Sequence, residues 1–258
     1  MALIGLEANP SLQSQLNGCD TVLNGNFPPA VPKSRQTADH PLRTFEIPLA
    51  SRGERGGRMN TRRMSLNDLG WATELLSEAF DGQRPATHMF REPKARKKLT
   101  YFMECGCKYA LLYGECYSTD DRKGVALWLV PGATHMTPGR MFRAGMFAAP
   151  YRFGIRDFKA FGAFVSHTDK IHRETLPEAH YYLLTLGVAP SSQGTGAGAR
   201  LVRDMLKRAD QERRPIYLET QRPENVPIYE RLGFHVASNT EVPASELRNW
   251  GMVWRPGD

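Results

Sequence analysis

The stretch that most constrains the fold runs from Tyr181 to Arg200, where an apolar segment is followed by a glycine-rich loop and an amphipathic segment. The residues up to Val188 are mostly apolar or aromatic, which predicts a short buried strand that ends before Pro190. From Leu201 onward, apolar residues recur at helical spacing, with charged residues on the opposite face. The stretch therefore predicts a strand, a loop and a helix in that order.

The glycine-rich loop at the start of the predicted helix is suited to a phosphate group. The N–H groups of the first helical turn have no partner within the helix, and the helix dipole adds partial positive charge there. Glycine also lets a ligand come close to the backbone. We therefore expect this loop to bind the diphosphate of a cofactor. The candidate cofactor-binding residues in it are Gln193, Gly194, Thr195, Gly196, Ala197 and Gly198.

A second strand and a short helix follow further along the chain. Residues 216–220 are apolar or β-branched at most positions, which predicts another strand. Asn225 precedes a short apolar helical segment as its expected N-cap, and Gly233 stands at its end.

These features together resemble the GNAT superfamily of acyl-CoA N-acyltransferases. The residues that carry the resemblance are Leu186, Val188, Gln193, Gly196, Gly198, Asn225 and the run Tyr229-Glu230-Arg231-Leu232-Gly233-Phe234. Within the superfamily, residues 183–256 are most similar to puromycin N-acetyltransferase-like members, notably at Leu218-Glu219-Thr220 and Glu241-Val242-Pro243. The resemblance is strong in the last third of the chain, faint over residues 64–131 and absent before residue 58.

The resemblance implies a fold and a reaction. The fold is α/β, with a mixed twisted central sheet that is splayed between its fourth and fifth strands and flanked by helices. The reaction moves an acetyl group from acetyl-CoA to a primary amine of a small molecule, by direct attack in a ternary complex, and detoxification is one role that it suggests. Leu186, Gly187, Val188 and Asn225 would join the loop in binding acetyl-CoA. Because glycine weakens a strand interior, Gly187 also predicts a bulge that opens the sheet.

The resemblance also assigns the catalytic residues. Tyr229 would be the general acid that protonates the departing thiolate, since a phenol with a pKa of about 10 can donate to a thiolate whose conjugate acid has a pKa of about 8.5. Glu219, at the end of its strand, is the first candidate for the general base, either directly or through water. Glu78 and His180 are the alternatives. Candidates for the outlying phosphate of the cofactor are Arg200, Arg203 and Arg222.

Composition and motif spacing indicate which binding partners and which cellular compartment to expect. The net charge of +7 arises from scattered basic clusters without interleaved aromatic residues, which is typical of solvated helix faces, so we expect no nucleic-acid binding. No apolar run approaches about twenty residues, so we expect no membrane span. The four cysteines lack the two-residue separation of zinc and redox motifs, so we expect no metal and a reducing compartment. The N-terminal residues fit no secretory or transit signal, which favours a cytoplasmic location. We expect a monomer or a homodimer.

The remaining chain divides into a tail and one domain. Residues 1–57 are rich in Pro, Gly, Ser and Asn and predict a flexible tail, partly docked through apolar residues over 42–49. Residues 58–258 form the predicted acetyltransferase domain. Its expected elements are a strand within 58–64, a helix with a capping box at Ser65 and Asp68, a loop over 81–92, a helix from Pro93, a hairpin over 114–130, helical segments within 138–176 and two final strands near 234–237 and 250–254.

Two other interpretations compete with this one. A Rossmann dinucleotide enzyme would also place glycines at a helix start and an acidic residue, here Glu219, at the end of the next strand. Against it, several polar residues and Pro190 separate the strand from the glycines, and too little chain follows for the remaining repeats. A non-catalytic acyl-CoA-binding module is the second alternative.

Overall fold

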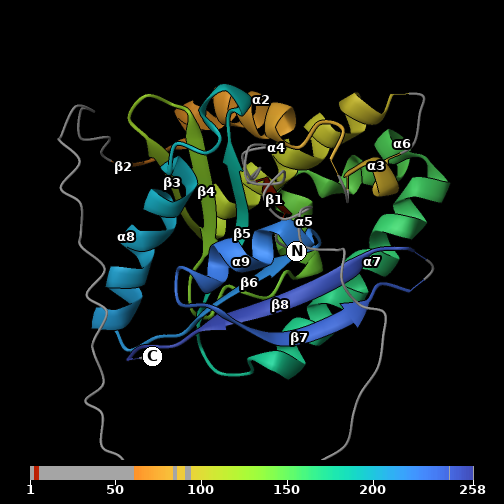
Figure 1. The fold of residues 1–258 in the computed structure, drawn as a ribbon. Helices are drawn as coiled ribbons and strands as arrows, with labels where there is room; N and C mark the ends of the chain where they lie inside the picture. Colours follow the sequence, from red (N-terminus) through yellow and green to blue (C-terminus); the bar gives the residue numbers. More distant parts are fainter. Residues whose placement is uncertain (1–2, 6–60, 84–85, 91–93, 244, 258) are drawn as a thin grey trace, which may run out of the picture. The chain divides into compact units, whose positions relative to one another are not determined.

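The structure, a computed structural model, describes residues 3–5, 61–83, 86–90, 94–243 and 245–257 (Figure 1). The described residues lie within one compact unit formed by Met1–Asn9 and Met59–Asp258. The predicted boundary between a tail and a domain at residue 57, and the apolar patch over 42–49, fall outside the described residues and stay predictions.

One mixed sheet organises the described chain. Its order is β2-β3-β4-β5-β6-β8-β7, and β1 pairs with β5 off this path. The pairs β5–β6 and β1–β5 are parallel, and the other neighbours are antiparallel. The strands are β1 (Leu3–Gly5), β2 (Thr61–Arg63), β3 (Gly114–Thr119), β4 (Gly124–Leu129), β5 (Tyr181–Val188), β6 (Ile216–Thr220), β7 (His235–Glu241) and β8 (Arg248–Trp254). The Rossmann alternative is wrong, because that fold needs a mostly parallel sheet.

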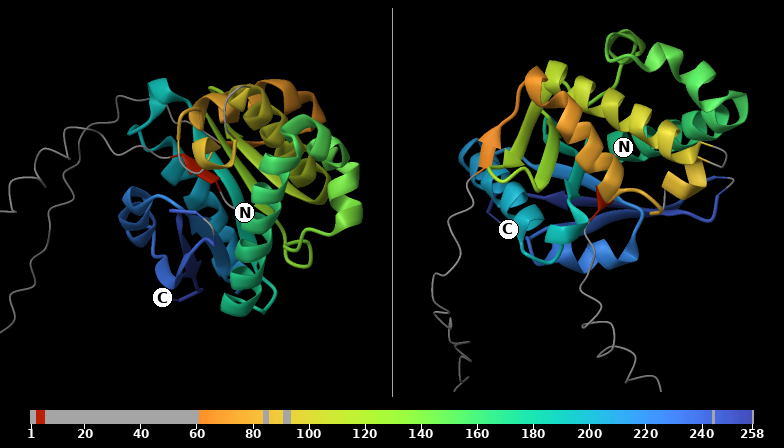
Figure 2. Two further views of the ribbon diagram at one scale, coloured as in Figure 1. Left: turned by 90° about the vertical axis from the view of Figure 1, so that its right-hand side faces the viewer. Right: turned by 90° about the horizontal axis from the view of Figure 1, so that it is seen from above.

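Helices cover both faces of the sheet (Figure 2). Helices α2 and α4 lie on one face, α8 lies on the other, and α7 runs alongside β7 and β8. The helices are α2 (Leu69–Ala79), α3 (Ala86–Met89), α4 (Ala95–Tyr113), α5 (Pro138–Arg143), α6 (Ala149–Phe153), α7 (Ile155–Thr175), α8 (Ala197–Gln211) and α9 (Val226–Glu230), with short 3-10 turns η1 (Leu66–Asp68), η2 (Met146–Ala148), η3 (Pro190–Ser192) and η4 (Pro223–Asn225). None of the described helices is both long and apolar enough to cross a membrane.

Most predicted elements are confirmed, and two boundaries are wrong. The capping box is present, with the Ser65 N–H donating to Asp68 Oδ2 at 2.9 Å. The loop predicted over 81–92 contains the one-turn helix α3, which is too short to show a helical period in the sequence. The helix predicted to begin at Pro93 begins at Ala95.

The strands β5 and β6 pair only at their beginnings. Tyr181–Leu183 faces Ile216–Leu218, whereas β5 continues to Val188. On the opposite edge, Leu127 and Trp128 of β4 face Thr185 and Leu183, so Leu184 is an extra residue that forms a β-bulge. A bulge bends and twists its strand. The predicted splay between the fourth and fifth strands of the domain, here β5 and β6, is therefore confirmed.

The predicted bulge at Gly187 is wrong, because Gly187 pairs regularly with Val125 of β4 and with Gly5 of β1. Its role is packing. A Cβ at this position would lie 2.5 Å from Leu76 Cδ2 of α2, so glycine lets α2 approach the sheet closely. A glycine in a strand indicates either a bulge or a close approach of another element to the strand. Gly187 permits the close approach of α2.

Strand β1 lies in the opening between β5 and β6. Leu3, Ile4 and Gly5 pair in parallel with Thr185, Leu186 and Gly187. These β5 residues come directly after the segment that β6 pairs with. The edge of β5 that β6 leaves is thus covered by residues from the beginning of the chain (Figure 2).

The packing of Gly187 gives a stability prediction. Gly187→Ala should lower the free energy of unfolding by about 1–3 kcal/mol, because the added methyl overpacks against Leu76. In a protein that already carries Leu76→Ala, Gly187→Ala should cost less, because the overpacked side chain has been removed. Urea unfolding of the unchanged protein, the two single variants and the double variant measures this difference. Purely additive effects would show that Gly187 does not act through this contact.

Candidate functional site

The loop before α8 depends on two glycines in the left-handed region. Gly194 has φ +76° and Gly196 has φ +87°, a conformation that other residues adopt only with strain. A Cβ at either position would meet none of the described atoms within 4 Å, so the space beside both is open. The first hydrogen bond of the helix runs from the Arg200 N–H to the Gly196 carbonyl at 3.0 Å. The N–H groups of Ala197 and Gly198 precede it and can bind an anion.

Two side chains of the loop hold its shape. Gln193 Nε2 donates to the carbonyl oxygen of Val188 at 3.2 Å, and Thr195 Oγ1 donates to the carbonyl oxygen of Ser192 at 2.7 Å. These bonds tie the loop to the end of β5. The loop therefore offers backbone N–H groups, while Gln193 and Thr195 position them.

The next predicted residue, Asn225, lies between β6 and α9. It occupies the N-cap position of α9, but its side chain makes no capping hydrogen bond. Instead, Asn225 Nδ2 donates to Thr220 Oγ1 at 3.1 Å, which ties the start of α9 to the end of β6. Asn225 is thus the N-cap residue of α9, as predicted, but its side chain bonds to Thr220 and makes no capping hydrogen bond.

Tyr229 of α9 is fully buried, with 0% of its surface exposed. Its ring packs edge-on against Phe234 at 5.7 Å between centroids. Its hydroxyl makes no hydrogen bond to the residues that the structure describes. Burial raises the pKa of Tyr229 well above its ordinary value, so the phenol keeps its proton. A buried hydroxyl without a partner costs about 1–3 kcal/mol, which a ligand atom at this position would offset.

Glu219 of β6 receives several hydrogen bonds although it is fully buried. Tyr182 and Tyr217 donate their hydroxyls to its two carboxylate oxygens at 3.2 and 3.1 Å, and Asn249 Nδ2 donates at 3.3 Å. Donors of this kind stabilise an ionised carboxylate. Glu219 directly follows Leu218, the last residue of β6 that pairs with β5, so it lies where the two strands part.

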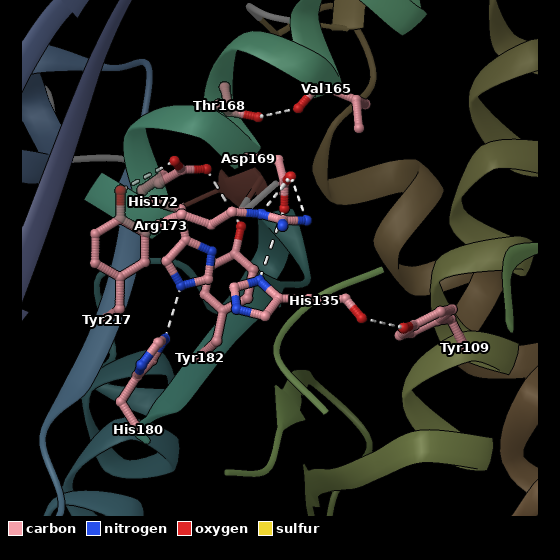
Figure 3. A network of polar contacts seen from close by, with 11 residues as sticks. Tyr109, His135, Val165, Thr168, Asp169, His172, Arg173, His180, Tyr182 and Tyr217 are labelled. Carbon is pink, nitrogen blue, oxygen red and sulfur yellow. Dashed lines mark hydrogen bonds and ion pairs between the residues drawn. The ribbon is translucent and has the colours of Figure 1, made fainter. Parts of the chain in front are cut away.

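Two histidines extend this cluster away from the sheet (Figure 3). The ring of His172 from α7 stacks on Tyr217 at 4.2 Å and 4° between planes. His172 Nε2 and His180 Nε2 are 2.7 Å apart, and His180 Nδ1 lies 2.5 Å from the carbonyl oxygen of Glu178. Burial lowers the pKa of His172 to about 2, and burial also lowers the pKa of His180. Both rings are therefore neutral near neutral pH.

The alternative bases are placed differently. Glu78 is exposed on α2, on the far side of that helix from its buried face. His180 is buried but contacts His172 and not Glu219. Glu219 is thus the predicted base that the structure brings to the point where the strands part. His172, Tyr182, Tyr217 and Asn249 were missed by sequence reasoning, because topology and not a local motif gathers them.

The arginine candidates for the outlying phosphate are at the surface. Arg200 and Arg203 are exposed on α8, near the open loop. Arg222 instead donates to Gln83 Oε1 at 2.9 Å and lies 3.5 Å from Glu224. Arg200 and Arg203 therefore remain better placed than Arg222 to reach a phosphate. Within the described part of the chain, His, Cys, Asp and Glu form no cluster suited to a metal ion.

The chain is similar to several known acetyltransferases. Residues 160–255 match the acetyltransferase (GNAT) domain family. An uncharacterized N-acetyltransferase of Schizosaccharomyces pombe is 27% identical over 183 residues, covering 68% of this chain and 74% of the relative. An acetyltransferase structure from Corynebacterium glutamicum, described as histone acetyltransferase HPA2 and related acetyltransferase, aligns with a TM-score of 0.57 and 21% identity over 78% of this chain and 97% of that one. Polyamine N-acetyltransferase of Drosophila melanogaster aligns with a TM-score of 0.52 and 13% identity over 76% and 99%.

The buried histidines give a prediction about pH. Their folded pKa values lie below the unfolded value of about 6.5, so the unfolded chain binds protons that the folded chain does not. Stability should therefore fall as the pH drops below about 6.5, by up to about 1.4 kcal/mol per pH unit for each histidine. Urea unfolding at a series of pH values should show a shallower slope for His172→Gln than for the unchanged protein. Equal slopes would mean that His172 does not stay neutral.

Proposed function

We propose that the chain moves an acetyl group from acetyl-CoA to the primary amine of a small molecule by direct attack in a ternary complex. The match of residues 160–255 to the acetyltransferase (GNAT) domain family and the splay between β5 and β6 support this proposal. The observation that carries the proposal is the position of Glu219. This carboxylate lies at the point where β5 and β6 part, one residue after their last paired position. An amine and a thioester can meet there.

The residues present fit acetyl-CoA in two places. The N–H groups of Ala197 and Gly198 and the open space beside Gly194 and Gly196 suit a diphosphate. The edge of β5 beyond Leu183, which β6 does not pair with, would suit an extended amide-bearing arm in place of β1, which pairs there at Thr185–Gly187. When bound, acetyl-CoA would supply a thioester carbonyl that an amine can attack.

The backbone of β5 would assist the reaction. We assign to the N–H groups within Leu186, Gly187 and Val188 the polarisation of the thioester carbonyl. Preorganised donors at such a position act in a water-poor site, where they stabilise developing charge most strongly.

Tyr229 is our general acid. Its phenol is kept protonated by burial and has no described partner, so its proton is available to a departing thiolate. The carbon–sulfur bond breaks as the carbon–nitrogen bond forms, and Tyr229 donates its proton to the sulfur. A positioned acid of this kind contributes about 10² to 10⁴ in rate.

Glu219 is our general base. It accepts the proton that the attacking amine loses, directly or through water. Tyr182, Tyr217 and Asn249 hold its carboxylate in one orientation. Proton acceptance by Glu219 and donation by Tyr229 together leave the enzyme ready for a second turnover after proton exchange with solvent.

Two comparisons bear on the nature of the acceptor. The resemblance to puromycin N-acetyltransferase-like proteins favours a detoxifying role, and the Drosophila neighbour of the same fold is a polyamine N-acetyltransferase. Thiol release from acetyl-CoA should therefore be screened against monoamines, arylamines, aminonucleosides and polyamines. Release with at least one amine, and identification of its N-acetyl product, supports the proposal. Saturable acetyl-CoA binding with no release across the panel would instead support a non-catalytic acyl-CoA-binding module.

Removal of one hydroxyl tests the acid. Tyr229→Phe should lower kcat by about 10² to 10⁴, because the thiolate then leaves without a proton donor. Stability should stay equal or rise by about 1 kcal/mol, because a buried hydroxyl without a described partner is lost.

Steady-state kinetics and urea unfolding on the same preparations separate these effects. Tyr181→Phe is the matched control, since it also removes a tyrosine hydroxyl, but one that donates to Glu212 at 2.6 Å. A loss of less than about threefold in kcat for Tyr229→Phe would remove Tyr229 from the mechanism.

A further inference from the structure

An apolar cavity lies beside the catalytic cluster. It has a volume of about 420 Å³ and lies between α5, η2 and α7, with Tyr182 and His172 at one end. Much of its wall is aromatic or methionine, including Met141, Phe142, Met146, Phe147, Phe158 and Phe161. Phe142 and Phe147 are exposed, with ring centroids 5.2 Å apart. The cavity can therefore hold an apolar body of small-molecule size.

A smaller cavity adjoins this one. It has a volume of about 40 Å³, shares Met136, Phe161 and Val165 with the larger one and is also lined by Leu184 and Thr185. Leu184 is the bulge residue at which β5 leaves β6. The apolar walls of the two cavities together thus reach from α7 to the bulge residue of β5.

The charges of the cavity do not suit several cations. Asp169 is the one carboxylate in its described lining, and Arg173 of the same helix pairs with it at 2.9 Å (Figure 3). His135 Nδ1 lies 3.9 Å from the same carboxylate. A second ammonium group of a ligand would lie against the methionine and phenylalanine wall without a counter-charge. Such burial of a charge is unfavourable.

The hydrogen bonds fix which nitrogen of His172 is left as an acceptor. His180 donates its Nδ1–H to the Glu178 carbonyl, so its Nε2 accepts. His172 must then donate its Nε2–H to His180, which leaves its Nδ1 as an acceptor. Because His172 lines the cavity, Nδ1 can accept an N–H of the incoming amine.

We infer that the acceptor is a monoamine attached to an aromatic or other apolar body, held in this cavity with its nitrogen toward Leu184 and Glu219. The inference rests on the proposed acetyl transfer and adds the substrate class. His172 is a specificity-determining residue in it, because its Nδ1 selects a hydrogen-bond donor at the inner end of the cavity.

Gly162 of α7 offers a way to fill the cavity. It lines the cavity, and a Cβ there would meet none of the described atoms within 4 Å. Gly162→Phe should lower kcat/KM for phenylalkylamines by about tenfold or more, while coenzyme A affinity, measured by calorimetry, stays unchanged. Gly162→Ala should retain most of the activity. Gly70→Phe is the matched control, since Gly70 is exposed on α2 and a Cβ there also meets no described atom within 4 Å.

The same assay compares amine classes. Phenylalkylamines and indolylalkylamines should exceed spermidine and agmatine in kcat/KM by at least about tenfold. A preference for spermidine or agmatine would overturn the inference and leave the proposed transfer intact. An unchanged kcat/KM in Gly162→Phe would also overturn it. Absence of thiol release with every amine, despite coenzyme A binding, would instead refute the proposed function and with it this assignment.

The pairing of β1 carries a second inference independently. Leu3–Gly5 occupies the edge of β5 at Thr185–Gly187, the edge that we assign to the cofactor arm. Both cannot use these backbone groups at once. The pairing spans only three residues, and so short a strand is weakly held. We infer that β1 is a displaceable strand that competes with acetyl-CoA for β5.

Proline substitution tests this competition without an activity assay. Neighbouring residues of a strand point their N–H groups to opposite edges, and proline has no N–H group. The double variant Leu3→Pro/Ile4→Pro therefore removes an N–H group that faces β5, whichever of the two residues carries it. Calorimetry should show coenzyme A binding about threefold to tenfold tighter than in the matched Leu3→Val/Ile4→Val control. Equal or weaker binding by the proline variant would overturn the inference. Absence of binding to both variants would refute the proposed function itself.

Discussion

The brief parallel pairing of β5 and β6 is the constraint on which the rest of the site depends. Three residues of each strand are paired, and the bulge at Leu184 then turns β5 away. Because the strands part, helix α8 follows β5 and helix α9 follows β6 around one opening. If β6 paired along the whole of β5, no edge would be left for the arm of the proposed cofactor or for β1, which pairs there in the structure.

Glu219 and Tyr229, the proposed base and acid, are both buried but have different surroundings. Glu219 accepts hydrogen bonds from Tyr182, Tyr217 and Asn249, which favours the ionised form of a carboxylate. The hydroxyl of Tyr229 has no described partner, and its burial disfavours the ionised form. The two surroundings therefore differ as a proposed base and acid require: donors surround the carboxylate, and burial keeps the phenol protonated. Pairs of groups with divergent surroundings are a mark of catalytic sites.

The sequence predicted those parts of the site that have local signatures. Gly194 and Gly196 stand where the backbone needs positive φ, and such positions are legible because few other residues tolerate them. The bulge at Leu184 has no mark of its own, and Gly187 drew the prediction to the wrong residue, since glycine also permits close packing. His172 could not be predicted, because α7 brings it onto Tyr217 from a distant part of the chain.

A crystal structure of the protein with coenzyme A tests the central claim most directly. The account predicts the diphosphate within hydrogen-bonding distance of the N–H groups of Ala197 and Gly198. It also predicts the arm along Leu186–Val188 in place of β1, with the sulfur beside the Tyr229 hydroxyl. Coenzyme A bound elsewhere, with β1 still paired to β5 and Tyr229 remote from the sulfur, would contradict the account.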